Sequence, residues 1–133
     1  MLGEFDSRIA RLRSLLGKTD PHLPFMDAVA QSIIENQSEY DDPEKRLDLR
    51  NRMLLVEQIP ELQAQITVMY SEWRAVISEF TAQRLGQQPD DLVPLAVGQM
   101  AFGAVMAAFS RWAGNPGEDL NELIRRSIGL LDH

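Results

Sequence analysis

Side chains that could carry out acid–base, nucleophilic or metal chemistry are few in this sequence and lie far apart. His22 and His133 are the only histidines, one between two prolines and the other at the end of the chain. Neither has a second ligand at helical spacing, as a metal site needs, or a partner that would support a general base. Cysteine is absent, which removes thiolate nucleophiles and cysteine-based zinc sites. We therefore expect no catalytic residue, no metal site and no cofactor.

Two adjacent pairs of carboxylates, Asp41–Asp42 and Asp90–Asp91, stand just before expected helices. Pro43 follows the first pair, and an Asp cap followed by proline in the first turn is a favoured helix N-terminus. We interpret both pairs as capping residues.

Aromatic and methionine side chains are better candidates for function than the charged residues. Phe25, Met69, Trp73, Phe102 and Met106 fall on the inward faces of three expected helices. Flexible methionine combined with flat aromatic surface suits an adaptable apolar pocket. Ordinary core packing predicts the same positions, and the pattern does not separate the two possibilities.

Tyr70 and Gln99 add polar groups near these apolar faces. A buried amide without a partner costs about 1 to 3 kcal/mol, so Gln99 bonds a helix carbonyl, faces solvent or meets a ligand. Val29 shares a face with Phe25, and we interpret Arg50 as a solvated surface charge. The predicted ligand-binding residues are Phe25, Val29, Met69, Tyr70, Trp73, Gln99, Phe102 and Met106.

The elements that must position these residues are helices. Proline, glycine and paired carboxylates divide the sequence into about six helical segments, and a strand-like period of two never persists. The sequence predicts a single all-α domain over residues 1–133, built as a bundle of about six helices. Expected helices cover about residues 4–16, 25–39, 44–58, 62–85 and 91–113, with a final helix after a cap at Asn115.

The segment from Leu62 to Leu85 has the clearest amphipathic pattern. At 100° per residue its large apolar side chains form one stripe, with small residues opposite. The stripe comprises Leu62, Ile66, Met69, Trp73, Val76, Ile77 and Phe80. We expect this helix to cross the whole depth of the domain.

The segment from Asp91 to Ala113 is apolar around almost its whole circumference. Its alanine, glycine and proline content and the lack of a Lys/Arg anchor before it argue against a membrane-spanning helix. Such a helix needs cover on more than one side, so we predict that its small-residue side and the final helix form a four-helix bundle with a second copy. The predicted homodimer interface comprises Val97, Ala101, Ala104, Ala108, Trp112, Leu123, Ile124, Ile128 and Leu131.

The charge balance limits the partners that we expect. A net charge of −7 repels phosphate backbones and anionic membranes. The N-terminus lacks the basic-then-apolar layout of a secretion signal. We expect a cytoplasmic protein that does not bind membranes and does not bind nucleic acid through these residues.

Several segments in series carry a family resemblance. They are Arg52–Leu62 with its Ile59-Pro60-Glu61-Leu62 break, the long amphipathic helix after it, Thr81-Ala82-Gln83-Arg84-Leu85-Gly86, Pro89-Asp90-Asp91, the alanine-rich helix ending in Arg111-Trp112, and the amphipathic final helix. In their order and lengths they resemble the C-terminal domain of TetR-family transcription regulators, over most of the chain.

The resemblance implies a homodimeric domain that senses a small, largely apolar effector in a regulator, expected to be a repressor. In that family a helix-turn-helix domain of about fifty residues precedes this region. The sequence has no counterpart of that domain, so DNA binding is expected only through a missing N-terminal domain. Residues 1–17 would correspond to the helix that connects the two parts.

Two other readings remain open. The first is a helical homodimer that mediates protein association and binds no ligand. A cavity of several hundred cubic ångströms would favour sensing, and a solid interior would favour association. The second is an enzyme, which ranks below both the sensing domain and the association module because no candidate acid, base or nucleophile has a partner that would activate it.

Overall fold

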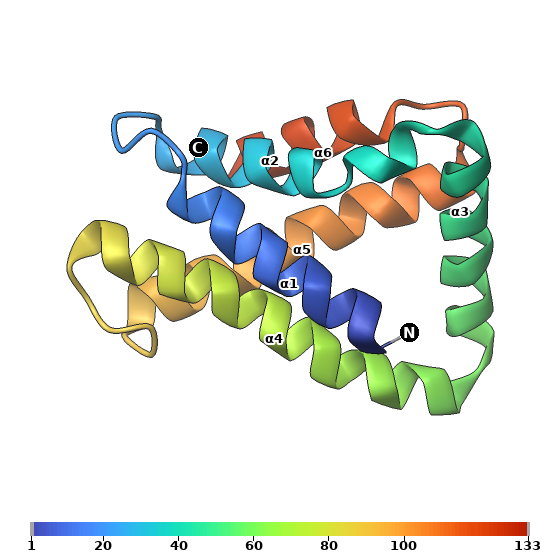
Figure 1. The fold of residues 1–133 in the computed structure, drawn as a ribbon, viewed down its shortest axis with the longest axis horizontal. Coiled ribbons are helices and arrows are strands. Elements are labelled where there is room, and N and C mark those ends of the chain that lie inside the picture. Colours follow the sequence, from blue (N-terminus) through green and yellow to red (C-terminus); the bar gives the residue numbers. More distant parts are fainter. Residues whose placement is uncertain (1, 133) are drawn as a thin grey trace.

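The computed structural model describes residues 2–132, with side chains described from Ser7 to Leu131, and it confirms the all-α prediction (Figure 1). No strand occurs among these residues. His133 lies outside them. The helices are α1 (Leu2–Gly17), α2 (Phe25–Asn36), α3 (Pro43–Gln58), α4 (Pro60–Leu85), α5 (Leu92–Gly114) and α6 (Leu120–Gly129), with two short 3₁₀ helices, η1 (Ser38–Asp41) and η2 (Leu130–Asp132).

Helix boundaries follow the capping chemistry of the sequence. The Asp42 carboxylate accepts a hydrogen bond from the backbone N–H of Glu44 at the start of α3, and Asp119 caps α6 in the same way. Asp91 precedes α5, although its carboxylate bonds the loop before the helix. Gly86 ends α4 with φ of 66°, a left-handed conformation that glycine adopts without steric cost.

Three local expectations need correction. The second helix ends at Asn36 rather than near residue 39, and η1 follows it. The first helix runs one residue beyond the expected residue 16, because Gly17 continues it without a positive φ; among the described residues only Gly86 has one. Asn115 terminates α5 instead of capping the final helix, because Asp119 supplies the carboxylate that the free N–H groups of α6 need.

The core lies where α1, α2, α5 and α6 meet the second half of α4. Figure 1 shows α2 and α6 side by side along one edge and α1 crossing over α5, and α1 also packs on α4. Each large apolar side chain buried here contributes about 1.5 to 3 kcal/mol to folding. The largest fully buried apolar side chains are Leu12, Leu16, Val29, Ile33, Ile77, Pro94, Trp112, Leu120, Ile124 and Ile128.

One arginine of α4 holds the loop between α1 and α2. The Arg84 guanidinium donates hydrogen bonds to the carbonyl oxygens of Asp20 and Leu23, at 3.0 and 2.7 Å. Arg13 of α1 also pairs with Glu79 of α4, at 3.1 Å. The C-terminal end of α1 is therefore fastened to α4.

The length and composition of α5 would allow it to cross a membrane. In the most apolar eighteen-residue stretch of this helix 39% is buried inside the domain, and both α4 and α6 pack along the helix. Core helices of soluble proteins can have the same length and apolar composition. Part of the apolar surface of α5 is thus buried inside the domain.

Candidate functional site

Three aromatic side chains of α4 and α5 form a cluster. The ring centroids of Tyr70 and Phe102 lie 5.0 Å apart, and those of Trp73 and Phe102 lie 5.6 Å apart. The Arg74 guanidinium lies 4.8 Å from the centroid of the Phe102 ring. Tilted and edge-on arrangements suit the aromatic quadrupole. The two helices therefore hold these rings together as an apolar wall.

The side chains around this wall face inward but are not enclosed. No side chain from Pro60 to Ala75 is buried, whereas Val76 and Ile77, one turn further along α4, are 2% and 0% exposed. The stripe predicted for the whole helix is therefore sealed only in its second half. The stripe residues left half-buried are Leu62, Ile66, Met69 and Trp73.

Helix α3 covers this half of α4 only loosely. It contains no buried side chain, and Leu49 and Met53 are half-buried against the edge of the core. Figure 1 shows α3 standing across the separated ends of α4 and α5. Arg50, expected to be solvated, instead donates a hydrogen bond from Nε to the carbonyl oxygen of Ala113 at 2.8 Å and ties α3 to the end of α5.

The hydroxyl of Tyr70 is a neutral polar group on this wall, in addition to the charged guanidinium of Arg74. Burial raises the pKa of Tyr70 above its ordinary value of 10.0, and the negative charge of Glu57, near the end of α3, raises it further. The phenol therefore stays neutral near pH 7 and can donate a hydrogen bond. A single polar group on an apolar wall can orient a ligand that is mostly apolar.

The structure brings some of the predicted ligand-binding residues to one region. Met69, Tyr70, Trp73 and Phe102 belong to it, and Met106 is half-buried one turn beyond Phe102 on α5. These residues belong to the facing surfaces of α4 and α5. They remain the candidates for an effector site.

Three others lie elsewhere. Phe25 stacks on Phe80 with ring centroids 5.5 Å apart, and Val29 is fully buried in the core. Gln99 is exposed, so it satisfies its amide with solvent and does not line the interior. Periodicity put Phe25 and Val29 on an inward face correctly, but that face belongs to the solid part of the bundle.

The predicted dimer face also needs correction. Ala101, Ala108 and Trp112 of α5 are buried inside the subunit, and so are Ile124 and Ile128 of α6. Their side chains pack between helices of the same chain and offer no surface to a second one. The predicted interface residues that keep some exposure are Val97, Ala104, Leu123 and Leu131.

A different side of α5 is open to solvent. It is small or apolar along its length, and Leu92 at its start is 80% exposed. Sequence reasoning missed this side because it assigned the alanines at 101 and 108 to the exterior. This outer face of α5 consists of Leu92, Val93, Ala96, Met100, Gly103, Ala107 and Ser110.

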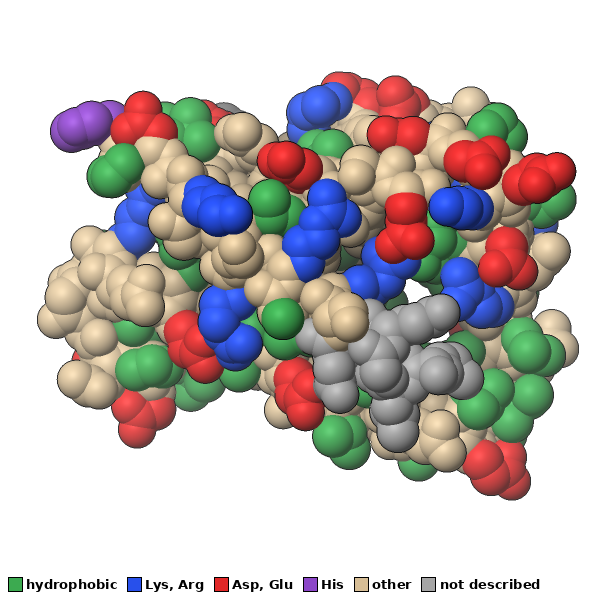
Figure 2. Space-filling model, viewed as in Figure 1, with side chains coloured by type: hydrophobic (Ala, Val, Ile, Leu, Met, Phe, Trp, Pro, Cys, Tyr) green, Lys and Arg blue, Asp and Glu red, His purple; other side chains and the backbone are tan. Residues whose placement is uncertain are grey.

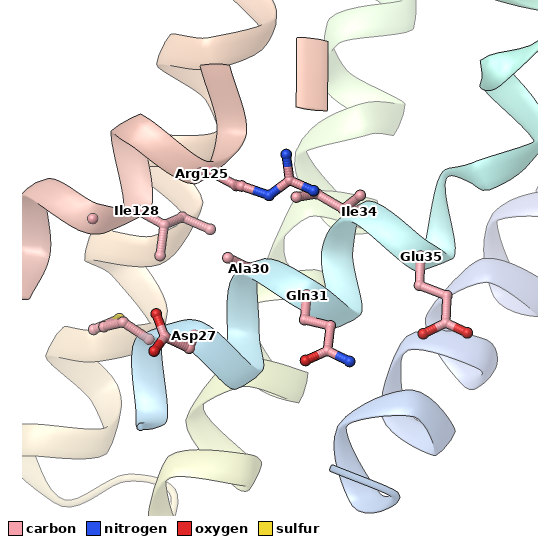
Figure 3. Close-up of a pocket in the computed structure, with 9 residues that line it drawn as sticks. Asp27, Ala30, Gln31, Ile34, Glu35, Arg125 and Ile128 are labelled. Atoms are coloured by element: carbon pink, nitrogen blue, oxygen red, sulfur yellow. The ribbon is translucent and has the colours of Figure 1, made fainter. Parts of the chain in front are cut away.

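A groove of about 450 Å³ runs between α2 and α6 (Figure 3). Ala30 and Ile128 point toward each other across it, and Arg125 extends from α6 over α2. None of the described side chains that line it has a buried polar atom without a partner. We therefore assign no ligand to this groove.

The described residues contain no cluster of three or more histidine, aspartate or glutamate side chains that could hold a metal ion. His22 is exposed in the loop between α1 and α2. The apolar wall of α4 and α5 holds most of the predicted ligand-binding residues.

Comparison with known proteins gives two matches. Residues 23–133 match the family model described as the MftR C-terminal domain, one of the TetR C-terminal domains. A protein of Mycobacterium tuberculosis, a proposed mycofactocin biosynthesis transcriptional regulator named MftR, is 31% identical over 129 residues. The match covers 97% of this chain and 64% of that protein, so the chain spans less than two thirds of its relative's length.

Proposed function

The chain belongs to the TetR family of transcription regulators, in the group with the MftR C-terminal domain, and we propose that it is the effector-sensing and dimerising part of such a regulator. Regulators of this family are generally dimeric DNA-binding proteins that respond to small molecules. Membership makes the chain a regulatory domain and not an enzyme.

The effector is a small, largely apolar molecule that binds between α3, the first half of α4 and α5. One observation carries this proposal: the apolar stripe of α4 is sealed beyond Val76 but half-exposed before it. Burying apolar surface contributes about 25 cal/mol per Å², so an uncovered inward-facing stripe can gain free energy by taking up a ligand. Tyr70 would donate a hydrogen bond to a polar group of that ligand.

The dimer forms through α5 and α6, with the outer face of α5 against a second copy. Small residues such as Gly103 and Ala107 allow two helices to approach closely, and Leu92 and Met100 add apolar area. Leu123 of α6 is half-buried, and we include it in the proposed interface. Sedimentation equilibrium of an Ala107→Glu variant measures this directly, and an unchanged dimer would exclude the face.

Effector binding would act on DNA through α1. In the whole protein we propose a DNA-binding domain before α1, whose two copies read half-sites about 34 to 36 Å apart. A change in the angle of α1 disfavours that spacing, and a coupling of about 1 to 3 kcal/mol gives a repressor a five- to 150-fold response. The name of the relative supports mycofactocin biosynthesis as the regulated process, and membership of a family of transcription regulators supports the cytoplasm as the location.

The experiment compares two neighbouring substitutions on α4. Met69 is half-buried on the proposed wall, whereas Val68 is 63% exposed. We expect wild type and Val68→Glu to bind the uncharged apolar dye Nile red saturably, and Met69→Glu to bind it at least about tenfold more weakly, because a carboxylate is costly in an apolar site. Dye fluorescence measures the binding.

The alternative is an association module whose interior closes fully when two copies meet. The loosely held α3 would then pack down on α4 in the dimer. Absence of saturable dye binding by the wild-type dimer, or equal binding by both variants, would favour this alternative over effector sensing.

A further inference from the structure

A second hollow lies apart from the apolar wall, between α1, η1 and α3. Its volume is about 460 Å³. Figure 2 shows blue Lys and Arg side chains gathered over α1 and toward α3, with red carboxylates beside them. The hollow is lined by Ser7, Arg8, Arg11, Asn36, Glu39, Tyr40, Lys45, Asp48 and Arg52.

The lining is positively charged within an acidic protein. Its four cations, Arg8, Arg11, Lys45 and Arg52, face two carboxylates, although the whole chain has a net charge of −7. The concentration of positive charge indicates an anionic occupant.

The ion pairs within the lining do not neutralise all of its positive charge. Arg8 pairs with Glu39 and donates to the Tyr40 hydroxyl at 2.6 Å. Arg52 pairs with Asp48 at 3.4 Å. Arg11 donates only to a backbone carbonyl, and Lys45 makes no hydrogen bond or ion pair with any described residue.

Two buried polar atoms of the lining have no partner among the described side chains. Nε of Arg52 is a donor without an acceptor, and Oδ1 of Asn36 is an acceptor without a donor. Asn36 is only 7% exposed, while its Nδ2 already donates to the Arg8 carbonyl oxygen at 3.2 Å. A buried polar atom left unpaired is costly. One bound group that both accepts and donates hydrogen bonds would satisfy both atoms.

We propose that this hollow binds a small oxyanion that also carries a hydroxyl group. An oxygen of the anion accepts from Arg52 Nε and from Lys45, and the hydroxyl donates to Asn36 Oδ1. Hydrogen phosphate groups and hydroxycarboxylates share this chemistry. The proposal does not depend on the apolar effector site, because no lining residue is shared with it.

The occupied site would act on α1. Arg8 and Arg11 both belong to α1, and Arg8 is held by Glu39 of η1. A bound anion competes with Glu39 for the Arg8 guanidinium and draws α3, through Lys45 and Arg52, toward α1. The site thus links α1 to the loosely held α3.

The test is thermal unfolding at constant ionic strength in sodium chloride, acetate, glycolate or phosphate. Acetate and glycolate differ by the hydroxyl that Asn36 would read. We expect phosphate, glycolate or both to raise the Tm saturably, and acetate to do so much less. Stabilisation by phosphate alone identifies a phosphate group as the occupant, and stabilisation by glycolate alone identifies a hydroxycarboxylate.

Lys45→Gln should weaken the anion at least about tenfold, because it removes one charge-assisted bond. Lys45 is exposed and pairs with none of the side chains that the structure describes, so this variant should fold, and Lys45→Arg should retain binding. Arg126→Gln removes the same charge from an exposed site on α6 and serves as the control. Equal stabilisation of Lys45→Gln and Arg126→Gln, no stabilisation by either hydroxylated anion, or acetate acting as strongly as glycolate would overturn the proposal.

Discussion

The two halves of α4 have the same amphipathic pattern but different surroundings. From Val76 onward the apolar stripe is enclosed by α1, α2 and α5, whereas from Leu62 to Trp73 the same stripe is only half-covered. The repeat of apolar residues determines which side of a helix faces inward. Whether that side is sealed depends on how close the neighbouring helices come.

The difference begins where α4 and α5 separate. At Gly98 the two helices touch so closely that a side chain has no room, because a Cβ atom would lie 2.8 Å from the Arg74 carbonyl oxygen. Beyond Phe102 the cover passes to α3, which has no buried side chain. The second half of α4 therefore belongs to the folding core, whereas the first half keeps apolar side chains that are only half-buried.

The largest contrast should come from removing the same atoms in each half. Ile77→Ala should lower the free energy of unfolding by about 2 to 5 kcal/mol, because it leaves a cavity in a filled core. Ile66→Ala, on the same stripe, should cost less than about 1 kcal/mol, because its site can still admit water. Urea unfolding measures both, and equal losses would show that the first half is sealed as well.

A smaller effect is expected at the point of closest approach. Gly98→Ala should destabilise the protein by about 1 to 3 kcal/mol, because a backbone carbonyl of α4 must move. Gly17→Ala, at the open end of α1, is the control and should be neutral or slightly stabilising. If the Gly98 variant were as stable as the control, the helices would not be locked together there.

The smallest effect is the pH dependence of stability that arises from Tyr70, in the half-covered first half of α4. The raised pKa of Tyr70 means that the unfolded chain loses the phenol proton first, near pH 10.0. The contribution of the protonated Tyr70 phenol to the free energy of unfolding is therefore complete below that pH. It declines as the pH rises through the folded-state pKa. Tyr70→Phe should flatten this decline, and Glu57→Gln should lower the pKa of Tyr70, as measured by tyrosinate absorbance. An unchanged titration in Glu57→Gln would remove Glu57 as a cause.

The fold was largely predictable from the sequence, because proline, glycine and Asp caps mark nearly every helix boundary. The two faces of α5 were not. Ala101 and Ala108 looked like an exterior surface because they are small, but small residues are what a buried helix needs where neighbours approach closely. An apolar helix with two candidate faces has no polar side to orient it, so periodicity alone could not choose between them.

The candidate site was predictable in part, for a related reason. Met69, Trp73 and Phe102 were predicted from their face and type and stay candidates, whereas Gln99 was included because polarity on an apolar helix suggested a buried role and the structure exposes it. The charged hollow was missed. Its signal was present as Arg and Lys at helical spacing in two segments, at Arg8 and Arg11 and again at Lys45 and Arg52. Only the tertiary fold shows that the two rows meet.

The grip of Arg84 on the loop after α1 makes that end of the helix a pivot. The sixteen residues of α1 form a rod of about 24 Å at 1.5 Å per residue. A swing of about 5° around the anchored end would displace the opposite tip by about 2 Å. Whatever precedes the rod in the whole protein would receive this motion enlarged by the length of the arm.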